Sequence, residues 1–356
     1  MKKILFYIST LRSGGAARVM VNLANAFAGA GYTVTLVTNF KDEHEYAFSD
    51  SVHRICMEGE ESKAGTLVKN LRRCTALRRI IRKERPDACV SFMRENNFRL
   101  ILSSFFLPSR TYVSVRSDPK MEYRGKVSRF LMRLLFPFAD GCILQTGDAL
   151  RWMPRRIQKR SRVIPNIVDE RFFHGQRAEH PEGILSVGRL TGCKRHDLML
   201  EAYASLAENV TDDLYFYGDG EELEALQSLA DRLGIADRVH FEGHISSLVP
   251  VYEKAKLFIM ASDFEGMPNA LLEALACGVP CISTDCPCGG PKEILQDGMG
   301  TLIPMGDATA LADAMKSLLT DERKQQAYSH TAQTAMQAYR TEKVWQQWCD
   351  FLFPNK

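Results

Sequence analysis

The stretch DFEGMPNALLEALACGVP, residues 263–280, places one glutamate just before a short helix and a second in its apolar middle. Pro268 fits the first turn of this helix, where its missing N–H costs nothing, and Gly278 marks the end about three turns later. Glu273 has apolar neighbours on both sides, so its carboxylate needs strong hydrogen-bond partners or must be neutralised. Glu265 lies in the loop before the helix. Glu273 and Glu265 are therefore either one member of a buried ion pair and a helix-capping acid, respectively, or parts of a ligand site.

Length and composition indicate a soluble globular protein of two domains. The chain has 356 residues, of which 45% are hydrophobic and 25% charged, and one core rarely extends over such a length. No apolar run approaches the length that spans a bilayer. The opening MKKILFYISTLR is short and ends in a charge, which favours a buried first strand over a signal peptide. The ten cysteines follow no zinc or disulfide pattern, which indicates reduced thiols.

The net charge of +3 conceals two halves of opposite sign. Residues 1–165 carry 30 Lys and Arg against 14 Asp and Glu, whereas the remainder carries 16 against 29. This division suggests two domains with different partners, and the basic half should attract phosphate or an anionic surface.

Strand candidates alternate with helical patterns along the whole chain. They cover residues 4–10, 32–40, 87–93, 111–117 and 141–146 in the first half, and 183–190, 214–220, 239–243, 257–262, 279–285 and 300–304 in the second. Apolar strands separated by helices predict an α/β fold with parallel, doubly wound sheets. We expect an N-terminal domain of residues 1–168 and a C-terminal domain of residues 169–356, with a hinge over 163–173. The tail, helical from about 322 to 352, should pack back toward the N-terminal domain.

Glycines and cations follow several of these strands, at the edge where open α/β sheets bind ligands. A glycine at this position lets backbone N–H groups approach a phosphate. Two cations beyond one strand would neutralise a diphosphate. Each signal alone is compatible with a tight turn or a solvated loop, but the series predicts a nucleotide pocket. The residues are Gly14 and Gly15 after the first strand, Arg189 and Lys194, then Gly218, and finally Gly243 and His244.

Two stretches, residues 67–85 and 124–138, combine apolar residues at helical spacing with many cations. One interpretation is a helix that buries its apolar stripe in the core and leaves a solvated charged face. The other is attachment to an anionic membrane surface, because each cation near such a surface adds about 1 kcal/mol.

The chain resembles a known family, the GT-B retaining glycosyltransferases of family 4. FEGMPNALLEALACG has that family's E-x7-E spacing, and TLRSGGAARVM, VIPNIVD, VGRLTGCKRHD, YGDGEE and GGPKEI occur in the family's order over almost the whole chain. The N-terminal half is most similar to enzymes that extend polyprenyl-diphosphate-linked glycans, including N-acetylgalactosaminyltransferases. The resemblance implies two Rossmann-like domains that face each other across a cleft. The first would bind the acceptor and the membrane, and the second the donor.

The resemblance also implies roles for particular residues. Glu273 would bind the ribose hydroxyls of a nucleotide, and Glu265 would lie against the donor sugar. Arg189 and Lys194 would hold the diphosphate and stabilise the leaving group, so no metal or other cofactor is expected. Arg116 occupies the region where relatives often carry a histidine beside the sugar. The donor would also contact Met267, Pro268, Asn269, Ala270 and Leu271.

The implied activity is retaining transfer of a hexose or N-acetylhexosamine from a nucleotide-sugar, which we expect to be a UDP-sugar. The acceptor would be a polyprenyl-diphosphate-linked or other glycan in polysaccharide or glycan biosynthesis. The protein would work from the cytoplasm, peripherally on the inner face of the cytoplasmic membrane, without a nucleic-acid partner. Two alternatives use the same fold: a nucleotide-sugar epimerase and a non-catalytic nucleotide-sugar-binding protein.

Overall fold

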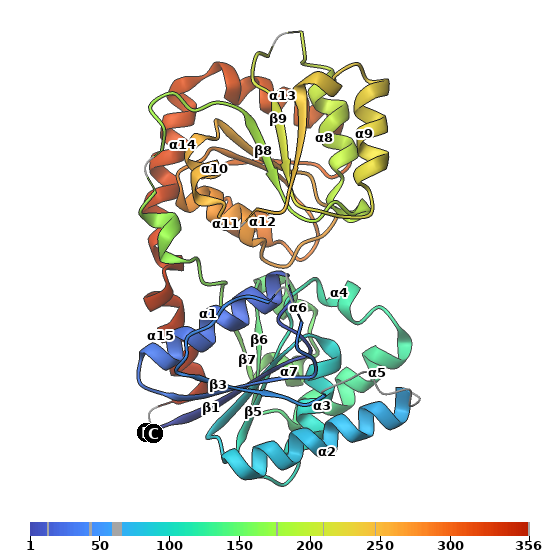
Figure 1. The fold of residues 1–356 in the computed structure, drawn as a ribbon, viewed down its shortest axis with the longest axis vertical. Coiled ribbons are helices and arrows are strands. Elements are labelled where there is room, and N and C mark those ends of the chain that lie inside the picture. The colour runs from blue at the N-terminus through green and yellow to red at the C-terminus, as the bar shows by residue number, and fades with distance from the viewer. Residues whose placement is uncertain are drawn as a thin grey trace. The chain divides into compact units, whose positions relative to one another are not determined.

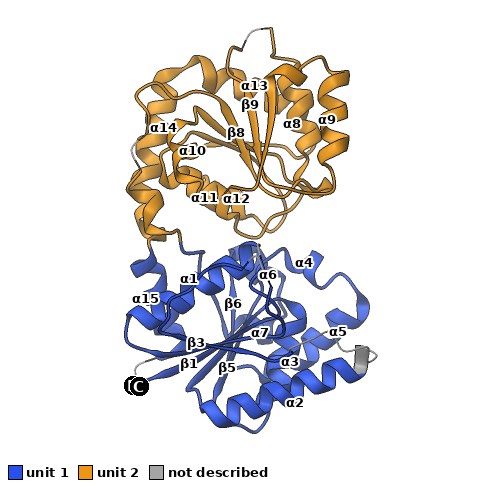
Figure 2. Cartoon of the chain, in the orientation of Figure 1, with its two compact units in different colours: residues 1–167, 341–356 blue, residues 168–340 orange. Residues whose placement is uncertain are grey.

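The computed structural model describes residues 1–12, 14–42, 45–58, 66–175, 177–208, 210–245 and 247–354. The chain divides into two compact units (Figures 1 and 2). The first unit is Met1–Ile167 with Thr341–Lys356, and the second is Val168–Arg340. The division lies within the stretch expected to be a hinge and one residue before the expected domain boundary. Of the terminal helices, the last one belongs to the first unit.

In the described part of the first unit, seven parallel strands form one sheet in the order β3-β2-β1-β4-β5-β6-β7. The chain leaves β1 to opposite sides, since Ile4 pairs with Val34 of β2 and with Ala88 of β4. Crevices for ligands form at such a switch point, beyond the carboxyl ends of the strands. The strands are β1 Lys3–Ile8, β2 Thr33–Thr38, β3 Val52–Cys56, β4 Ala88–Phe92, β5 Arg110–Ser114, β6 Gly141–Leu144 and β7 Ser161–Val163.

Helices complete the first unit. The last helix, α15, packs on α1, and its fully buried Trp348 belongs to the same core as Phe6 and Phe27. Burial of three aromatic side chains makes this contact a large contribution to the stability of the unit. The helices are α1 Gly15–Gly29, α2 Thr66–Glu84, α3 Arg94–Ser104, α4 Pro119–Glu122, α5 Lys126–Leu135, α6 Gly147–Trp152, α7 Arg155–Gln158 and α15 Thr341–Leu352, with the 3-10 helix η1 Phe136–Phe138.

The second unit has the same architecture of a parallel sheet with helices. Its six described strands lie in the order β10-β9-β8-β11-β12-β13. The strands are β8 Ile184–Val187, β9 Leu214–Tyr217, β10 Val239–Gly243, β11 Leu257–Met260, β12 Cys281–Thr284 and β13 Thr301–Ile303. The helices are α8 His196–Ala204, α9 Leu223–Arg232, α10 Val249–Lys254, α11 Asn269–Ala276, α12 Gly290–Ile294, α13 Ala308–Thr320 and α14 Glu322–Ala335, with 3-10 turns η2 Glu170–Phe173, η3 Gly192–Lys194, η4 Ala236–Arg238 and η5 Met336–Tyr339.

The α/β class and all eleven predicted strands are confirmed, but two strands were missed. Both missed strands, β3 and β7, lie at the edges of the first sheet. Edge strands are only partly buried, and β3 carries His53 and Arg54 between its apolar residues, which weakens the hydrophobic signal. The predicted start of the glutamate helix was also wrong by one residue. Pro268 is the residue before its first turn, where its carbonyl accepts from Leu272 N–H.

Candidate active site

Glycines bring the loops after β8, β9 and β10 into backbone contact. Gly218 has a φ of +139°, and a Cβ at this position would overlap the carbonyl oxygen of Gly188. Its N–H donates to the carbonyl of Gly243 at 2.8 Å. Only glycine fits so close an approach. The predicted residues Gly218 and Gly243 therefore lie side by side at the carboxyl edge of the sheet, and the exposed His244 follows them.

Lys194 and Glu265, two predicted catalytic residues, form an ion pair through Nζ and Oε1. The same Oε1 accepts from Ser262 Oγ at 2.8 Å. Only 23% of the Lys194 side chain and 13% of the Glu265 side chain is exposed. The ammonium and the carboxylate thus hold each other at the carboxyl edge, where β8 and β11 end. Arg189 lies in the same loop as Lys194, on the surface.

The N-terminus of α11 lies beside this pair in the chain. Met267 and Pro268 are buried, and the N–H groups of Ala270 and Leu271 have no acceptor within the helix, as is general for a first turn. The helix dipole adds partial positive charge there. A Cβ at Gly290, after β12, would overlap the carbonyl oxygen of Gly266, so the loop after β12 closes against this turn. Asn269 is the first helical residue.

Glu273 lies one turn further along α11 and is 5% exposed. The hydroxyl of Tyr252, itself fully buried, donates to Glu273 Oε2 at 3.5 Å and to the Ala270 carbonyl at 3.2 Å. The carboxylate is close enough to Cys277 to add to the effect of burial, which raises the pKa of that thiol to about 12. Glu273 is thus a buried carboxylate with a phenol partner, in the apolar surroundings that the sequence predicted.

The remaining predicted residues belong to the first unit. Gly14 precedes α1, where its carbonyl accepts from Arg18 N–H at 3.1 Å, and Gly15 is the first residue of that helix. Arg116 follows β5, and its guanidinium donates to Asn166 Oδ1. All three lie beyond the carboxyl end of a strand of the first sheet.

Ser262 and Gly188 were missed by sequence reasoning. Ser262 is fully buried just after β11, and its carbonyl accepts from Thr284 Oγ1 at 2.7 Å, which ties it to the end of β12. A polar residue directly after an apolar strand and three residues before Glu265 was the available signal. Nothing local indicated that Gly188 would meet Gly218, because that contact depends on how two strands pair.

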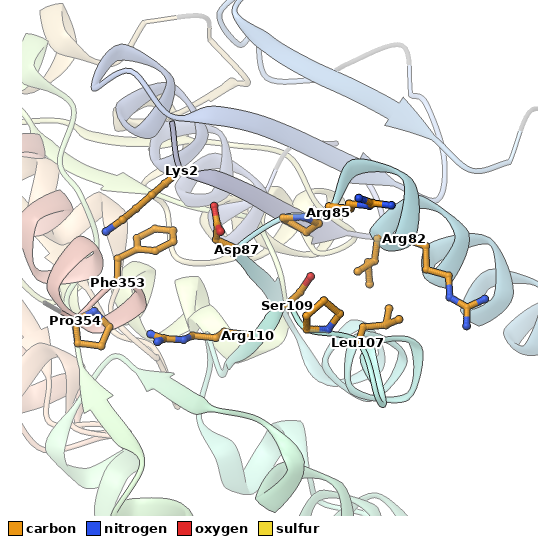
Figure 3. A pocket seen from close by; sticks show the side chains of 12 residues that line it. Lys2, Arg82, Arg85, Asp87, Leu107, Ser109, Arg110, Phe353 and Pro354 are labelled. Atoms are coloured by element: carbon orange, nitrogen blue, oxygen red, sulfur yellow. The ribbon is translucent and has the colours of Figure 1, made fainter. Parts of the chain in front are cut away.

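A pocket of about 880 Å³ lies at the opposite edge of the first sheet (Figure 3). Its walls are the residues before β1, β4 and β5, the end of α2 and the segment after α15. Asp87, one of its lining residues, accepts from the Lys3 N–H at 2.7 Å. Ligands of open α/β sheets bind beyond the carboxyl ends of the strands, so we do not place the active site in this pocket.

The first unit exposes apolar and basic side chains together on α5 and η1. Four apolar side chains at helical spacing are exposed by half or more, Val127 by 72%. Phe138 also packs edge-on against Phe105, and the adjacent Phe106 is 99% exposed. We call these residues the α5 face: Val127, Phe130, Leu134, Phe138 and Phe106, with the exposed cations Lys126, Arg129 and Arg133.

Stable monomers rarely expose such contiguous apolar surface. Of the two interpretations of residues 124–138, burial in the core therefore holds for Leu135 but not for these four exposed side chains. Within the part of the chain that the structure describes, no helix is both long and apolar enough to cross a membrane. Over the same residues, no three His, Cys, Asp or Glu side chains are grouped in a way that could hold a metal ion.

Two family models match consecutive parts of the chain. The model described as Glycosyltransferase Family 4 matches residues 13–172, and the model described as Glycosyl transferases group 1 matches residues 168–335. The chain belongs to the family 4 glycosyltransferases. Its two parallel-sheet units define the GT-B fold.

A relative and two solved structures show how far the similarity extends. The chain is 29% identical to a GalNAc-α-(1→4)-GalNAc-α-(1→3)-diNAcBac-PP-undecaprenol α-1,4-N-acetyl-D-galactosaminyltransferase of Campylobacter jejuni, over 98% of this chain and 97% of the relative. Sucrose-phosphate synthase from Thermosynechococcus elongatus superposes with a TM-score of 0.84 at 18% identity, covering 98% and 97% of the two chains. Anabaena Alr3699/HepE, solved with UDP and glucose, gives 0.82 at 17% identity over both whole chains.

Proposed function

We propose that the protein transfers a hexose or N-acetylhexosamine from a UDP-linked donor to a polyprenyl-diphosphate-linked glycan, with retention of anomeric configuration. The observation that carries the proposal is the Lys194–Glu265 pair, fixed among glycine loops beside the N-terminus of α11. The acceptor class is supported by the relative whose name contains an undecaprenyl diphosphate-linked glycan.

The second unit binds the donor in this proposal. Arg189 and Lys194 hold the diphosphate and stabilise the negative charge that develops on it as the glycosidic bond breaks. Glu273 accepts hydrogen bonds from the ribose hydroxyls. Glu265 contacts the sugar, and the turn Met267–Leu271 lies against the sugar and diphosphate, where the helix dipole favours negative charge. No metal or other cofactor takes part.

The acceptor hydroxyl attacks on the face of the sugar that the diphosphate leaves. The leaving oxygen is therefore close to the incoming hydroxyl and can take its proton, so the reaction needs no protein nucleophile. Gly14, Gly15 and Arg116 of the first unit bind substrate in this proposal.

We propose further that the α5 face rests on the inner leaflet of the cytoplasmic membrane. Its cations add electrostatic attraction to anionic lipids, and its exposed apolar side chains add a contribution that salt does not screen. Membrane attachment would bring the first unit to a lipid-linked acceptor.

A panel of UDP- and GDP-sugars, read by thermal shift of the purified protein, identifies the donor. Transfer is then measured with and without a polyprenyl-diphosphate-linked glycan. Turnover that depends on this acceptor supports the proposal. Interconversion of the nucleotide-sugar without acceptor would instead identify an epimerase, and binding without any turnover would identify a non-catalytic protein.

A further inference from the structure

Arg116 is held rigidly at the carboxyl edge of the first sheet. Its guanidinium lies over the Phe92 ring, with the central carbon 4.6 Å from the ring centroid. One of its nitrogens donates to Asn166 Oδ1, and the same oxygen accepts from Gln145 Nε2 at 2.7 Å. Phe92 at the end of β4, Gln145 after β6 and Asn166 after β7 therefore fix the orientation of this cation.

The charge on Arg116 is not paired with a carboxylate within the part of the chain that the structure describes. Its Nε and Nη1 are buried without a hydrogen-bond acceptor among the described residues, and no carboxylate of those residues is within ion-pair distance. Burial lowers the pKa of Arg116 to about 9, although the charge of Glu122 opposes this shift. Glu122 is a poor counter-charge, because burial raises its own pKa to about 7. Arg116 is half-buried, and its two buried nitrogens without an acceptor are costly to fold around.

Arg99, in the same unit, shows how a structural buried arginine is satisfied. Its guanidinium donates to Asn70 Oδ1 at 2.9 Å and to Asn96 Oδ1 at 3.2 Å, and it lies 3.7 Å from a Glu95 oxygen. Both arginines follow strands of the same sheet, yet only Arg99 has a carboxylate partner. The difference indicates that the cation of Arg116 has its partner outside the protein, in a bound ligand.

We infer that Arg116 is the counter-charge for an anionic group of a substrate, either a carboxylate or a phosphate, bound at the carboxyl edge of the first sheet. A planar guanidinium pairs with either group through two parallel hydrogen bonds. The carboxylate would belong to a donor in which the proposed hexose is oxidised to a hexuronic acid, and the phosphate to the diphosphate of a lipid-linked acceptor. The adjacent Gln145 Oε1, buried without a donor among the described residues, would accept from a hydroxyl of the same substrate. This inference rests on the proposed sugar transfer.

The test compares the whole protein with the Arg116→Gln, Arg116→Lys and Arg99→Gln variants. The donor arm measures the affinities for UDP-glucuronic acid and UDP-glucose by isothermal titration. The acceptor arm measures KM for a glycan linked to polyprenyl diphosphate and for the same glycan without the diphosphate. In one arm, Arg116→Gln should weaken binding of the anionic probe at least about tenfold, because one partner of a buried charge pair is lost. The neutral probe should change less than about twofold. Arg116→Lys should restore part of the loss.

Which arm responds identifies the source of the anion, and either response supports the inference. Equal losses for the anionic and neutral probes, no loss in either arm, or failure of the wild-type protein to bind any probe would each overturn it. Thermal unfolding excludes a structural role: Arg116→Gln should be at least as stable as wild type, whereas Arg99→Gln should be less stable. The proposed transfer fails separately, if wild-type protein binds these probes but moves no sugar.

Discussion

The Lys194 site of the second unit and the α5 face of the first unit differ in how their cations are paired. Three cations of the second unit form ion pairs with carboxylates: Lys194 with Glu265, Lys256 with Asp212 at 2.9 Å, and Arg238 with Asp213 at 3.2 Å. Ion pairs such as Arg54–Glu45 also occur in the first unit, but away from the α5 face. In the described part of the first unit, the three cations of the α5 face have no carboxylate within ion-pair distance. Internally paired charges suit a small site that is formed before its ligand arrives, whereas unpaired exposed charges suit a large anionic surface.

The sharpest test of this contrast is removal of the cations at the proposed diphosphate site. We expect Lys194→Ala and Arg189→Ala each to lower turnover at least about a hundredfold, since each removes one preorganised charge contact with the leaving diphosphate. Steady-state kinetics measures the effect. Lys256→Ala is the matched control, because it breaks an ion pair of similar burial at the opposite edge of the same sheet. Near-normal turnover in both site variants would remove the diphosphate assignment.

The residues of the Lys194 site could be located from the sequence, whereas the sequence left open whether the apolar stripe of the α5 face is exposed. Glu265, Lys194 and the glycines could be found because strand ends and glycine turns are local patterns. The partial burial of Arg116 and the role of Ser262 depend on contacts between segments far apart in the chain, such as Arg116 with Asn166. Likewise, the apolar stripe of α5 has a helical period whether it faces solvent or core. Only packing decides which side chains become exposed, and the four that did include Phe130 and Phe138.

The unpaired surface is tested by reversing its charge. Replacing Lys126, Arg129 and Arg133 together by Glu should abolish binding to vesicles that contain anionic lipid, and leave donor-nucleotide binding unchanged. Wild-type binding should weaken but persist as salt rises, since exposed charges are screened within about 10 Å at 0.1 M. Vesicle flotation measures both effects.

Arg155, Arg156 and Lys159 form the matched control for that reversal. They are equally exposed cations of the same unit, but they lie outside the α5 face. Their replacement by Glu changes the net charge by the same amount and should weaken binding much less. Equal binding of wild-type protein to neutral and anionic vesicles would show that the α5 face is only solvated surface.

The two glutamates of the second unit should separate binding from turnover. Glu273→Gln should weaken donor-nucleotide affinity by about tenfold, because a hydrogen bond to a charged group contributes about 1.5–3 kcal/mol. Glu265→Gln should lower turnover more than affinity, because its proposed contact is with the reacting sugar. Isothermal titration with the nucleotide alone distinguishes them. Unchanged nucleotide affinity in the Glu273 variant would contradict the ribose role.

The carboxyl group of Glu122, whose Oε1 is buried, predicts a pH-dependent difference in the stability of the first unit. Burial raises its pKa from 4.5 to about 7, and hydrogen bonds from the backbone of Arg116 and Arg94 offset only part of this shift. The folded state therefore holds a proton that the unfolded state has released, so this contribution to stability is complete below pH 4.5 and is lost as the pH rises through 7. Glu122→Gln should stabilise the protein by about 1–3 kcal/mol at pH 8 and hardly at pH 4.5. Thermal unfolding at both pH values measures this, with exposed Glu221→Gln as the control. An equal shift at both pH values would exclude the proton as the cause.

The smallest expected effect concerns metal ions. EDTA should change turnover by less than about twofold. The reason is that Arg189, Lys194 and the N-terminus of α11 place positive charge at the proposed diphosphate position. In other transferases Mg²⁺ neutralises the diphosphate in this way. Lys194 is also paired with Glu265 before the donor arrives, so donor binding would release this ammonium toward the diphosphate rather than require a new cation. The measurement is initial rate after EDTA treatment, with added Mg²⁺ as the comparison and Lys194→Ala as the sensitive background. If the variant, but not the wild type, recovers activity with Mg²⁺, the metal is substituting for the lost ammonium, which would support the charge assignment directly. Complete loss of wild-type activity in EDTA, restored by Mg²⁺, would show instead that the paired cation does not neutralise the leaving group.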